Sequence, residues 1–266
     1  MKAWLAAALL LLAAGARADD ALHVPWTALL QRHVAWNAEG TASTVDYDGF
    51  ARDRAALDAY LTALAAVPQA SFDGWHKAER QAFLINAYNA QTVALILTRW
   101  PDLESIKDLG GLFSSPWKQR YFDLLGARRS LDEVEHGLLR GAPDFDEPRI
   151  HFAVNCASIG CPALRNEAYV AERLDAQLED QTKRFLSDRS RNRYAPNSNT
   201  LEVSKIFDWY GSDFRSGDRG KADLPAFFAR YASQMSDTPE AQQRIRDGTA
   251  KIVFLDYDWA LNDARK

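Results

Sequence analysis

One segment of the chain, residues 77–99, is apolar in nearly every helical direction, and it constrains the fold more than any other part. Its apolar side chains are Phe83, Leu84, Ile85, Tyr88, Val93, Leu95, Ile96 and Leu97. A helix that is apolar on all sides is normally central and buried. Trp100 and Pro101 follow it, and proline cannot continue a helix. We therefore expect the other elements to pack around this one central helix.

The first residues have the pattern of a secretory signal peptide. Lys2 precedes a run of alanine and leucine, and the small residues Ala16 and Ala18 follow that run. This order predicts cleavage after Ala18. The run is shorter than the ~20 residues that span a bilayer, no cysteine follows it for lipid attachment, and no second segment is apolar enough to span. We expect residues 1–18 to be removed and residues 19–266 to form a single soluble domain, periplasmic or secreted.

The composition limits the class of partner. The formal net charge is −4, and charges of both signs occur throughout the chain, which argues against a nucleic-acid surface. Eight Trp, nine Tyr and thirteen Phe supply a sizeable core, so disorder is not expected. No motif indicates a cofactor. The expected partner is a small-molecule or peptide ligand.

Shorter elements are predicted on both sides of the central helix. Helical spacing predicts helices over residues 26–36, 47–66, 168–186, 223–231 and 239–246. Composition predicts strands over residues 149–155, 201–203 and 251–257, a hairpin over residues 121–128, and a long surface loop over residues 187–199. Several helices with few strands indicate an α+β fold, mainly helical with a small, mostly antiparallel sheet. A papain- or transglutaminase-like layout is one arrangement of that class.

A further helix is predicted over residues 131–140. It begins with a capping box, in which Ser130 is followed three residues later by Glu133. Its apolar stripe contains Glu135, and His136 lies at the edge of that stripe.

Glu135 needs a partner, because a carboxylate on the buried side of a helix is costly unless it is paired. One interpretation is that Glu135 orients an imidazole or holds a substrate group. The other is a structural salt bridge to an arginine such as Arg149 or Arg165.

The densest set of reactive residues lies at residues 149–162, which contain both cysteines of the chain. The expected strand ends at Cys156, and the unpaired backbone amides at the end of an element favour a thiolate. Cys156 is therefore a candidate nucleophile, with Ser158 and nearby amides stabilising an oxyanion.

Two other roles stay open for the cysteines. In an oxidising compartment Cys156 and Cys161 can form a disulfide. Closing so small a loop contributes only about 2 kcal/mol, which suits a labile or reactive pair better than a structural one. The third role is a metal site with His136 and His151, although their spacing to the cysteines is not a usual zinc pattern.

A thiolate at Cys156 requires an imidazole as its base, and His136 is the better candidate. His151 lies in the same expected strand as Cys156, so the two side chains point to opposite faces unless the chain bends at Asn155. The remaining histidines are expected to be exposed: His23, His33 and His76.

Further polar residues are candidate binding groups. Asn86 and Asn89 share one face of the central helix, where they either bind substrate or tie a neighbouring loop to the helix, and the second interpretation is favoured. Asn155 and Arg149 are also candidate substrate-binding residues. The aromatic-acidic segments at residues 204–214 and 256–262 are expected to build core, although Asp208 or Asp258 within them is a candidate to orient a histidine.

The chain resembles the domain-of-unknown-function 547 family. The matching segments are residues 82–90, 130–136, 149–158 with Cys161 and Pro162, and 204–210. This family occurs in bacterial exported proteins and at the C-terminus of some plant leucine-zipper proteins. The resemblance implies no settled activity. Some animal members resemble fusions with glutaredoxin modules, which favours thiol chemistry by association alone.

The sequence thus gives three hypotheses. In the first, the protein is a thiol-dependent hydrolase or transferase acting on an amide, peptide or thiol-containing substrate: Cys156 attacks, His136 or His151 takes its proton, Glu135 orients the base, and Cys161 resolves or protects the thiol. In the second, it is a ligand-binding or assembly module with a structural Cys156–Cys161 disulfide. In the third, it binds a metal.

Overall fold

The computed structural model describes residues 21–111, 114–141, 145–216 and 224–265. The signal peptide expected at residues 1–18 lies outside these ranges. Among the described residues, no helix is long and apolar enough to cross a membrane.

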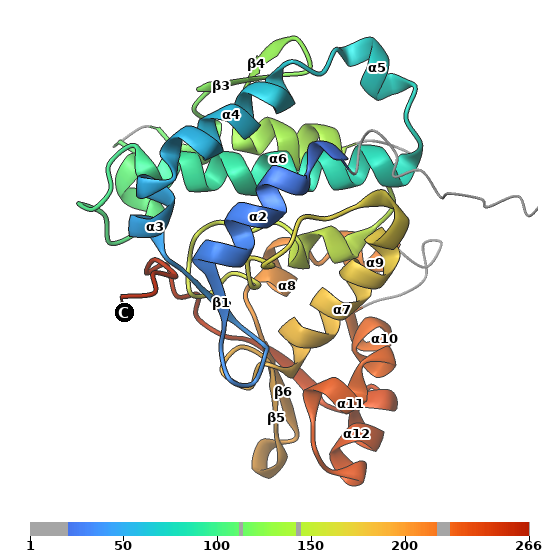
Figure 1. Ribbon diagram of the computed structural model, residues 1–266. Coiled ribbons are helices and arrows are strands. Elements are labelled where there is room, and N and C mark those ends of the chain that lie inside the picture. The colour runs from blue at the N-terminus through green and yellow to red at the C-terminus, as the bar shows by residue number, and fades with distance from the viewer. Residues whose placement is uncertain (1–20, 112–113, 142–144, 217–223, 266) are drawn as a thin grey trace, which may run out of the picture.

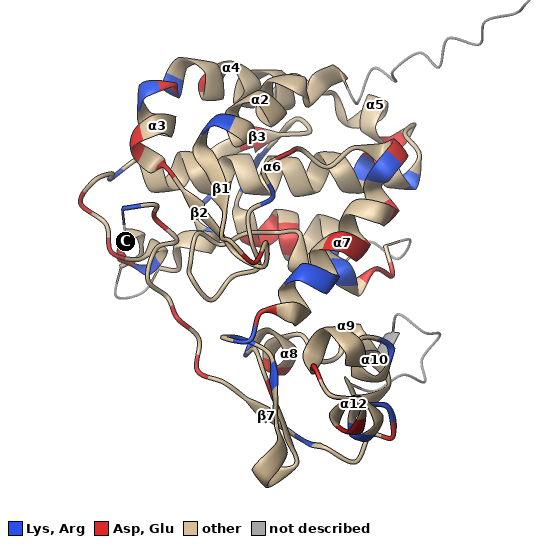
Figure 2. Cartoon of the chain, turned by 60° about the horizontal axis from the view of Figure 1, so that its bottom comes forward, with Lys and Arg blue, Asp and Glu red and all other residues tan. Residues whose placement is uncertain are grey.

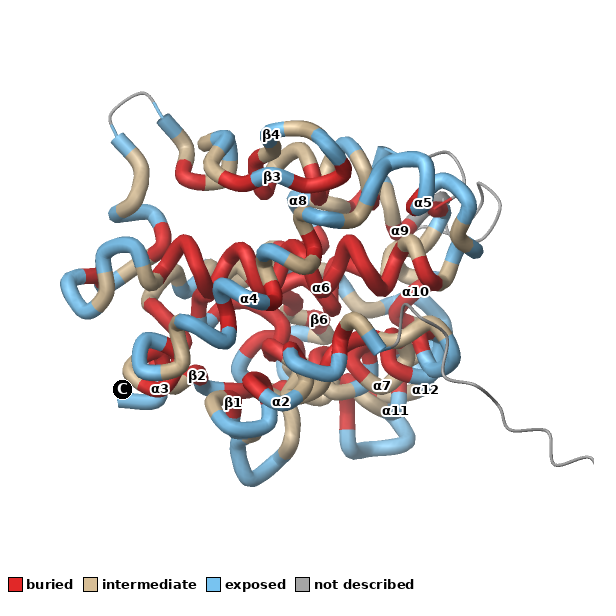
Figure 3. The backbone as a smooth tube through the Cα atoms, turned by 45° about the horizontal axis from the view of Figure 1, so that its top comes forward, coloured by how far each residue is buried: buried red, intermediate tan, exposed pale blue. Residues whose placement is uncertain are grey.

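The longest helix, α6 (Lys77–Leu97), runs through the middle of the upper part of the molecule, as the sequence predicted (Figure 1). It begins at a capping box, in which the Glu79 carboxylate accepts a hydrogen bond from the His76 amide at 2.7 Å. Every residue from Gln81 to Ile96 is buried, and the burial colouring separates this helix from the exposed outer surfaces around it (Figure 3). Four turns buried on all sides require neighbours in every direction.

The N-terminal helices cover one side of α6. They are α2 (Val24–His33), α3 (Tyr47–Arg52), α4 (Arg54–Ala65) and α5 (Gln69–Asp73). The Trp26 ring stacks on Tyr60 with centroids 5.7 Å apart, which joins α2 to α4. The helix expected over residues 26–36 ends earlier, because Val34 is extended and starts strand β1 (Val34–Trp36), which pairs with β2 (Ser43–Val45).

A second apolar cluster is built on phenylalanines from the C-terminal half: Phe185, Phe207, Phe214, Phe227 and Phe228 pack with Phe152. The helices that carry it are α7 (Leu174–Ser187), α8 (Ile206–Trp209), α9 (Asp213–Ser216), α10 (Leu224–Arg230), α11 (Ala232–Met235) and α12 (Pro239–Arg246). Figure 1 shows these elements below α6. Basic and acidic residues are interspersed over the outer helices (Figure 2).

The strands form three small sheets. β3 (Phe122–Leu124) and β4 (Ala127–Arg129) make the predicted hairpin, and its turn residues Leu125 and Gly126 both have positive φ. β5 (Arg193–Ala195) pairs antiparallel with β6 (Thr200–Val203), which pairs parallel with β7 (Lys251–Phe254). The α+β class, mainly helical with mostly antiparallel pairing, is confirmed.

Two local predictions are wrong. The strand expected over residues 149–155 is instead a 3₁₀ helix, η4 (Pro148–Phe152), because Pro148 occupies its first turn and the Glu147 carboxylate caps the Arg149 amide at 3.1 Å. The long loop expected over residues 187–199 is ordered by a buried ion pair between Asp188 and Arg191 at 2.5 Å, and it continues into β5.

The helix expected from residue 168 also begins later than predicted. Residues Ala171–Arg173 form a 3₁₀ turn, η5, and α7 starts at Leu174. The predicted capping box is present: the Ser130 amide donates to Glu133 at 2.9 Å, and the Glu133 amide donates to the Ser130 hydroxyl at 3.2 Å.

Candidate active-site cleft

A cleft of about 300 Å³ lies where residues of the two apolar clusters meet. Its polar and sulfur-containing lining consists of Cys156, Cys161, His151, His136, Glu135, Asp132 and Ser115. Its aromatic lining consists of Tyr88, Trp117, Trp209, Tyr210, Tyr257 and Trp259. The structure therefore brings together both cysteines, both candidate bases and the buried carboxylate that the sequence singled out.

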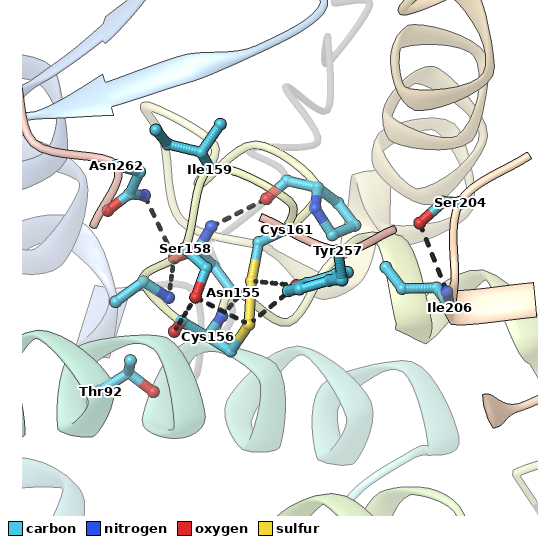
Figure 4. Close-up of a disulfide and its surroundings, with 12 residues drawn as sticks. Thr92, Asn155, Cys156, Ser158, Ile159, Cys161, Ser204, Ile206, Tyr257 and Asn262 are labelled. Atoms are coloured by element: carbon cyan, nitrogen blue, oxygen red, sulfur yellow. Dashed lines mark hydrogen bonds between the residues drawn. A yellow bond between two sulfur atoms is a disulfide. The ribbon is translucent and has the colours of Figure 1, made fainter. Parts of the chain in front are cut away.

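The two cysteines form a disulfide in the wall of the cleft (Figure 4). Cys156 is partly exposed, whereas Cys161 is buried with 4% of its surface accessible. The Cys156 amide donates a hydrogen bond to the Cys161 sulfur at 2.9 Å, and the Tyr257 hydroxyl lies 3.1 Å from each sulfur. Of the two cysteines, Cys156 is the more exposed residue.

Asparagine side chains hold the segment that carries the cysteines. Asn89 of α6 donates to the Ala153 carbonyl at 2.9 Å and accepts from the Asn155 amide at 2.8 Å. Asn155 in turn donates to the Pro162 carbonyl at 2.8 Å, which closes the loop between the two cysteines. Asn86 makes the equivalent pair of bonds to the backbone of Tyr169, at 2.7 and 2.9 Å.

The side chains of Asn86 and Asn89 therefore tie neighbouring loops to the central helix, which is the role that the sequence favoured for them. Asn86, Asn89, Asn155 and Ser158 are buried, and in the part of the chain that the structure describes none of them lines the cleft. The Ser158 hydroxyl lies 3.4 Å from the Cys156 carbonyl and 3.9 Å from its sulfur.

The residue after the candidate nucleophile has an uncommon backbone conformation. Ala157 has a φ of 62°, in the left-handed region that residues with a side chain seldom adopt. Its amide donates to the Asn155 side chain at 2.9 Å and its carbonyl accepts from the Asn262 amide at 3.2 Å. These bonds hold a sharp bend directly behind Cys156, and such local strain is concentrated at functional sites.

His151 is the imidazole that a carboxylate holds in place. Its Nε2 lies 2.8 Å from Asp213 Oδ2, and its ring stacks on Tyr210 with centroids 4.1 Å apart. His151 is only 2% exposed, and its Nδ1 is buried without a hydrogen-bond partner among the described residues. Because Nε2 faces a carboxylate, the ring keeps its proton there and leaves Nδ1 as a bare acceptor.

His136 has different surroundings. It lies in a helical segment of π type, η3 (Glu133–Leu139), a kind of turn often found at functional sites. Its Nδ1 accepts a hydrogen bond from Arg140 at 2.7 Å, and its Nε2 lies 3.8 Å from Asp132. Its side chain is 37% exposed.

Asp213 is the carboxylate that binds both His151 and Arg140. Arg140 binds it with two hydrogen bonds of 2.6 and 2.9 Å, in addition to the bond with His151. Burial alone would raise the pKa of this carboxyl, but the hydrogen bonds from His151 and Arg140 outweigh burial and hold that pKa well below its usual range. Asp213 is therefore ionised at neutral pH and fixes both partners.

Glu135 is paired with hydroxyl groups. It is buried, and it forms hydrogen bonds with Tyr88 and Tyr210. Burial raises the pKa of both tyrosines, and the charge of Glu135 raises it further.

Among the described residues, Glu135 forms no salt bridge with an arginine. Arg149 binds Glu147, Asp175 and Glu179 instead, and Arg165 binds Glu167 and Asp180. Arg149 lines a second depression of about 490 Å³, outside the cleft that contains the cysteines.

Two of the histidines expected at the surface are not exposed. His23 is fully buried, with its Nδ1 2.7 Å from the Tyr60 hydroxyl, and burial lowers its pKa to about 3. His33 is partly buried and lies 2.8 Å from Asp53. Both rings face partners on α4 or at its start, so helix packing removes them from solvent.

The sequence did not single out Asp213, Arg140 or Tyr257 as members of the site. Asp213 and Tyr257 lie in the two aromatic-acidic segments that were expected to build core. Asp208 pairs with Lys205 at 2.7 Å and Asp258 accepts from the Ala260 amide at 2.9 Å, and neither carboxylate has a hydrogen bond to a histidine among the described residues. The described residues contain no group of three or more histidine, cysteine or acidic side chains arranged to hold a metal.

Residues 72–186 match the model of a family described as "Protein of unknown function, DUF547". Searches of the curated proteins and of the solved structures gave no match, so the papain- or transglutaminase-like layout stays a prediction. The matched segment contains α6, Glu135, His136, His151 and both cysteines, whereas Asp213 and Tyr257 lie beyond it. Over this segment, with its central helix and its cysteine loop, the chain is similar to the DUF547 family.

Proposed function

We propose that the protein is a thiol-dependent hydrolase or transferase that acts on an amide, a peptide or a thiol-containing substrate. The observation that carries this proposal is that one cleft is lined by the more exposed of the two cysteines, Cys156, and by His151, an imidazole that Asp213 orients. These are the two parts that nucleophilic catalysis by a thiol requires.

The reactive form is the reduced one. An external dithiol first reduces the Cys156–Cys161 bond and leaves as its own disulfide. His151 Nδ1 then accepts the proton of the Cys156 thiol, and the thiolate adds to the carbonyl carbon of the substrate. The tetrahedral intermediate collapses to a thioester as the imidazolium gives its proton to the leaving amine or thiol. Water or a second nucleophile then attacks the thioester and returns Cys156 as a thiol.

His151 is the better base in the structure, although His136 was the first candidate from the sequence. Asp213 accepts from Nε2 of His151, which leaves the opposite ring nitrogen ready to take a proton. His136 uses its Nδ1 to accept from Arg140, and it shares that arginine with Asp213. We assign His136 a place at the rim of the cleft, where it contacts the leaving group or an incoming nucleophile.

Cys161 acts in this proposal as a protective partner. Its sulfur is buried and accepts the Cys156 amide hydrogen. When the thiol of Cys156 is not in use, exchange with an external disulfide re-forms the Cys156–Cys161 bond and releases the external partner as a dithiol. An exported location suits such a pair, since disulfides persist in oxidising compartments.

The second candidate function is a ligand-binding or assembly module in which the disulfide is purely structural. The observation that favours it is the bond between the two sulfurs in a cleft that is also lined by six Trp and Tyr side chains.

One experiment separates the two functions. The protein is reduced with a phosphine, exposed to 4-nitrophenyl acetate, and analysed by intact mass and peptide mapping. We expect one acetyl group on Cys156, formed at a rate that falls at least about tenfold in His151→Gln. Cys156→Ser is expected to take up none. His76→Gln is the matched control, because His76 is an exposed histidine outside the cleft.

The enzyme proposal fails if reduced wild-type protein is not acetylated on Cys156. It also fails if His151→Gln and His76→Gln acetylate at the same rate. A disulfide that resists the phosphine in the folded protein would support the binding module instead.

A further inference from the structure

We propose that the cleft binds a cationic amine, a primary or methylated ammonium group, seated on its aromatic rings beside the sulfur of Cys156. The inference rests on the proposed function for the role of that sulfur, and it narrows the substrate class to amides or peptides that carry such a group, or to an amine that accepts the acyl group.

The first observation is the charge of the lining. Asp132 and Glu135 line the cleft, and no lysine or arginine is among the described lining residues. Arg140 lies nearby, but its two hydrogen bonds to Asp213 neutralise it within a local pair. The cleft therefore has an excess of carboxylate over fixed cationic side chains, which favours a cationic ligand.

The second observation is the arrangement of the rings. Tyr257 contacts Trp259 and Trp209 with centroids 4.5 and 4.8 Å apart, and interplanar angles of 51° and 52°. Trp117 meets Trp259 nearly edge-on at 5.7 Å and 66°. These rings line the cleft at different inclinations, and the π face of an aromatic ring attracts an ammonium group.

The third observation is that cations of the protein already contact rings of this group. Lys107 Nζ lies 3.8 Å from the centroid of Trp259, and the guanidinium carbon of Arg140 lies 4.8 Å from that of Tyr210. Neither cation lines the cleft. Trp259 and Tyr210 thus each already attract one cation of the protein.

Tyr257 connects the rings to the chemistry. Its ring belongs to the aromatic group, and its hydroxyl lies 3.1 Å from both sulfurs (Figure 4). An ammonium group on the faces of Tyr257, Trp209 and Trp259 is therefore placed next to Cys156. In a substrate that carries the ammonium group, the carbonyl that Cys156 attacks is then within a few bonds of that group. In the other case, the bound amine is the second nucleophile, which takes the acyl group from Cys156.

The test measures binding to the oxidised protein by calorimetry, with four probes of matched length: hexylammonium, hexyltrimethylammonium, 1-hexanol and hexanoate. We expect both ammonium probes to bind at least about tenfold tighter than hexanol, and hexanoate to bind most weakly. We expect Trp259→Leu and Asp132→Asn each to weaken hexylammonium binding by about fivefold or more. Asp123→Asn is the matched control, a carboxylate on the exposed β3–β4 hairpin.

Three results would overturn the inference: hexanoate or hexanol binding as tightly as hexylammonium, no measurable binding of either ammonium probe, or equal affinities in Asp132→Asn, Trp259→Leu and Asp123→Asn. Because the binding is measured without a free thiol, it is independent of the acetylation of Cys156. Loss of acetylation with preserved ammonium binding refutes the proposed function alone, and the reverse result refutes only the substrate class.

Discussion

His151 and Asp213, which are 62 residues apart in the sequence, are joined by a hydrogen bond of 2.8 Å at the edge of the cleft. The bond links the 3₁₀ helix that precedes Cys156 to the start of α9. It thereby fixes the orientation of the imidazole and leaves Nδ1 as the ring nitrogen without a partner among the described residues.

The first prediction concerns this bond. Asp213→Asn removes the negative charge that holds His151 and Arg140. In a Cys161→Ser background, where Cys156 is the only thiol, we expect the variant to slow alkylation of Cys156 by iodoacetamide at pH 7 by about tenfold or more. Asp208→Asn serves as the control, because Asp208 is an exposed carboxylate paired with Lys205. Equal rates for the two variants would show that Asp213 does not act on the thiol.

The second prediction concerns the two sulfurs. Cys156 is partly exposed and Cys161 is buried, so the two single-cysteine proteins differ in access to reagent. We expect Cys161→Ser protein to be alkylated at least about tenfold faster than Cys156→Ser protein under native conditions. Both should react at the same rate in 6 M guanidinium, on the order of a free thiol. A faster reaction at Cys161 would reverse the assigned roles.

The third prediction concerns pH. Burial lowers the pKa of His23 to about 3, whereas an unfolded histidine titrates near 6.5. The unfolded state therefore binds a proton first, and the folded state loses stability as pH falls from about 6.5 towards 3. We expect wild-type protein to lose about 3 kcal/mol more unfolding free energy between pH 7.5 and 4 than His23→Gln protein does.

Urea unfolding at the two pH values measures this difference. His76→Gln, which changes an exposed histidine, should follow the wild-type protein. If His23→Gln also follows the wild type, the imidazole of His23 is not buried as a neutral ring in solution.

Local patterns account for the parts of the fold that could be predicted. The buried helix α6, the hairpin around Gly126 and the capping box of Ser130 each depend on residues close in sequence. The composition of residues 149–155 suggested a strand, but the turn chemistry of Pro148 and Glu147 overrides it and gives a 3₁₀ helix.

The site could be predicted only in part, for the same reason. The sequence indicated Cys156, His151 and His136 as candidates, because the chain has few cysteines and histidines and these three lie within a short segment. The partner of His151 was not evident, since no spacing rule connects it to Asp213 across an intervening helix. Likewise, His23 is buried by Tyr60, a residue 37 positions away.

The fourth prediction concerns the support of the cysteine loop. Asn89 satisfies the carbonyl of Ala153 and the amide of Asn155, both of which are buried. Asn89→Ala leaves both groups without a partner, which we expect to lower the unfolding free energy by about 2–4 kcal/mol. The exposed Asn197 is the matched control, and Asn197→Ala should change it by less than about 0.5 kcal/mol. Urea unfolding at pH 7.5 measures both, and a loss below 1 kcal/mol in Asn89→Ala would contradict the structural role.

The last prediction separates the two functions of Tyr257. Its hydroxyl reaches both sulfurs, and burial raises its pKa, so it stays a protonated donor through neutral pH. A hydrogen bond to a thiolate favours the charged form, so Tyr257→Phe should raise the pKa of the Cys156 thiol and slow its alkylation at pH 7 by about threefold to tenfold. The ring remains, so the affinity for hexylammonium should stay within about twofold. Tyr194→Phe, which removes a hydroxyl bound to Asn199 in the β5–β6 turn, should change neither quantity. If Tyr257→Phe weakens ammonium binding but leaves the rate of alkylation as it was, the phenol hydroxyl belongs to the ligand site and not to the thiol.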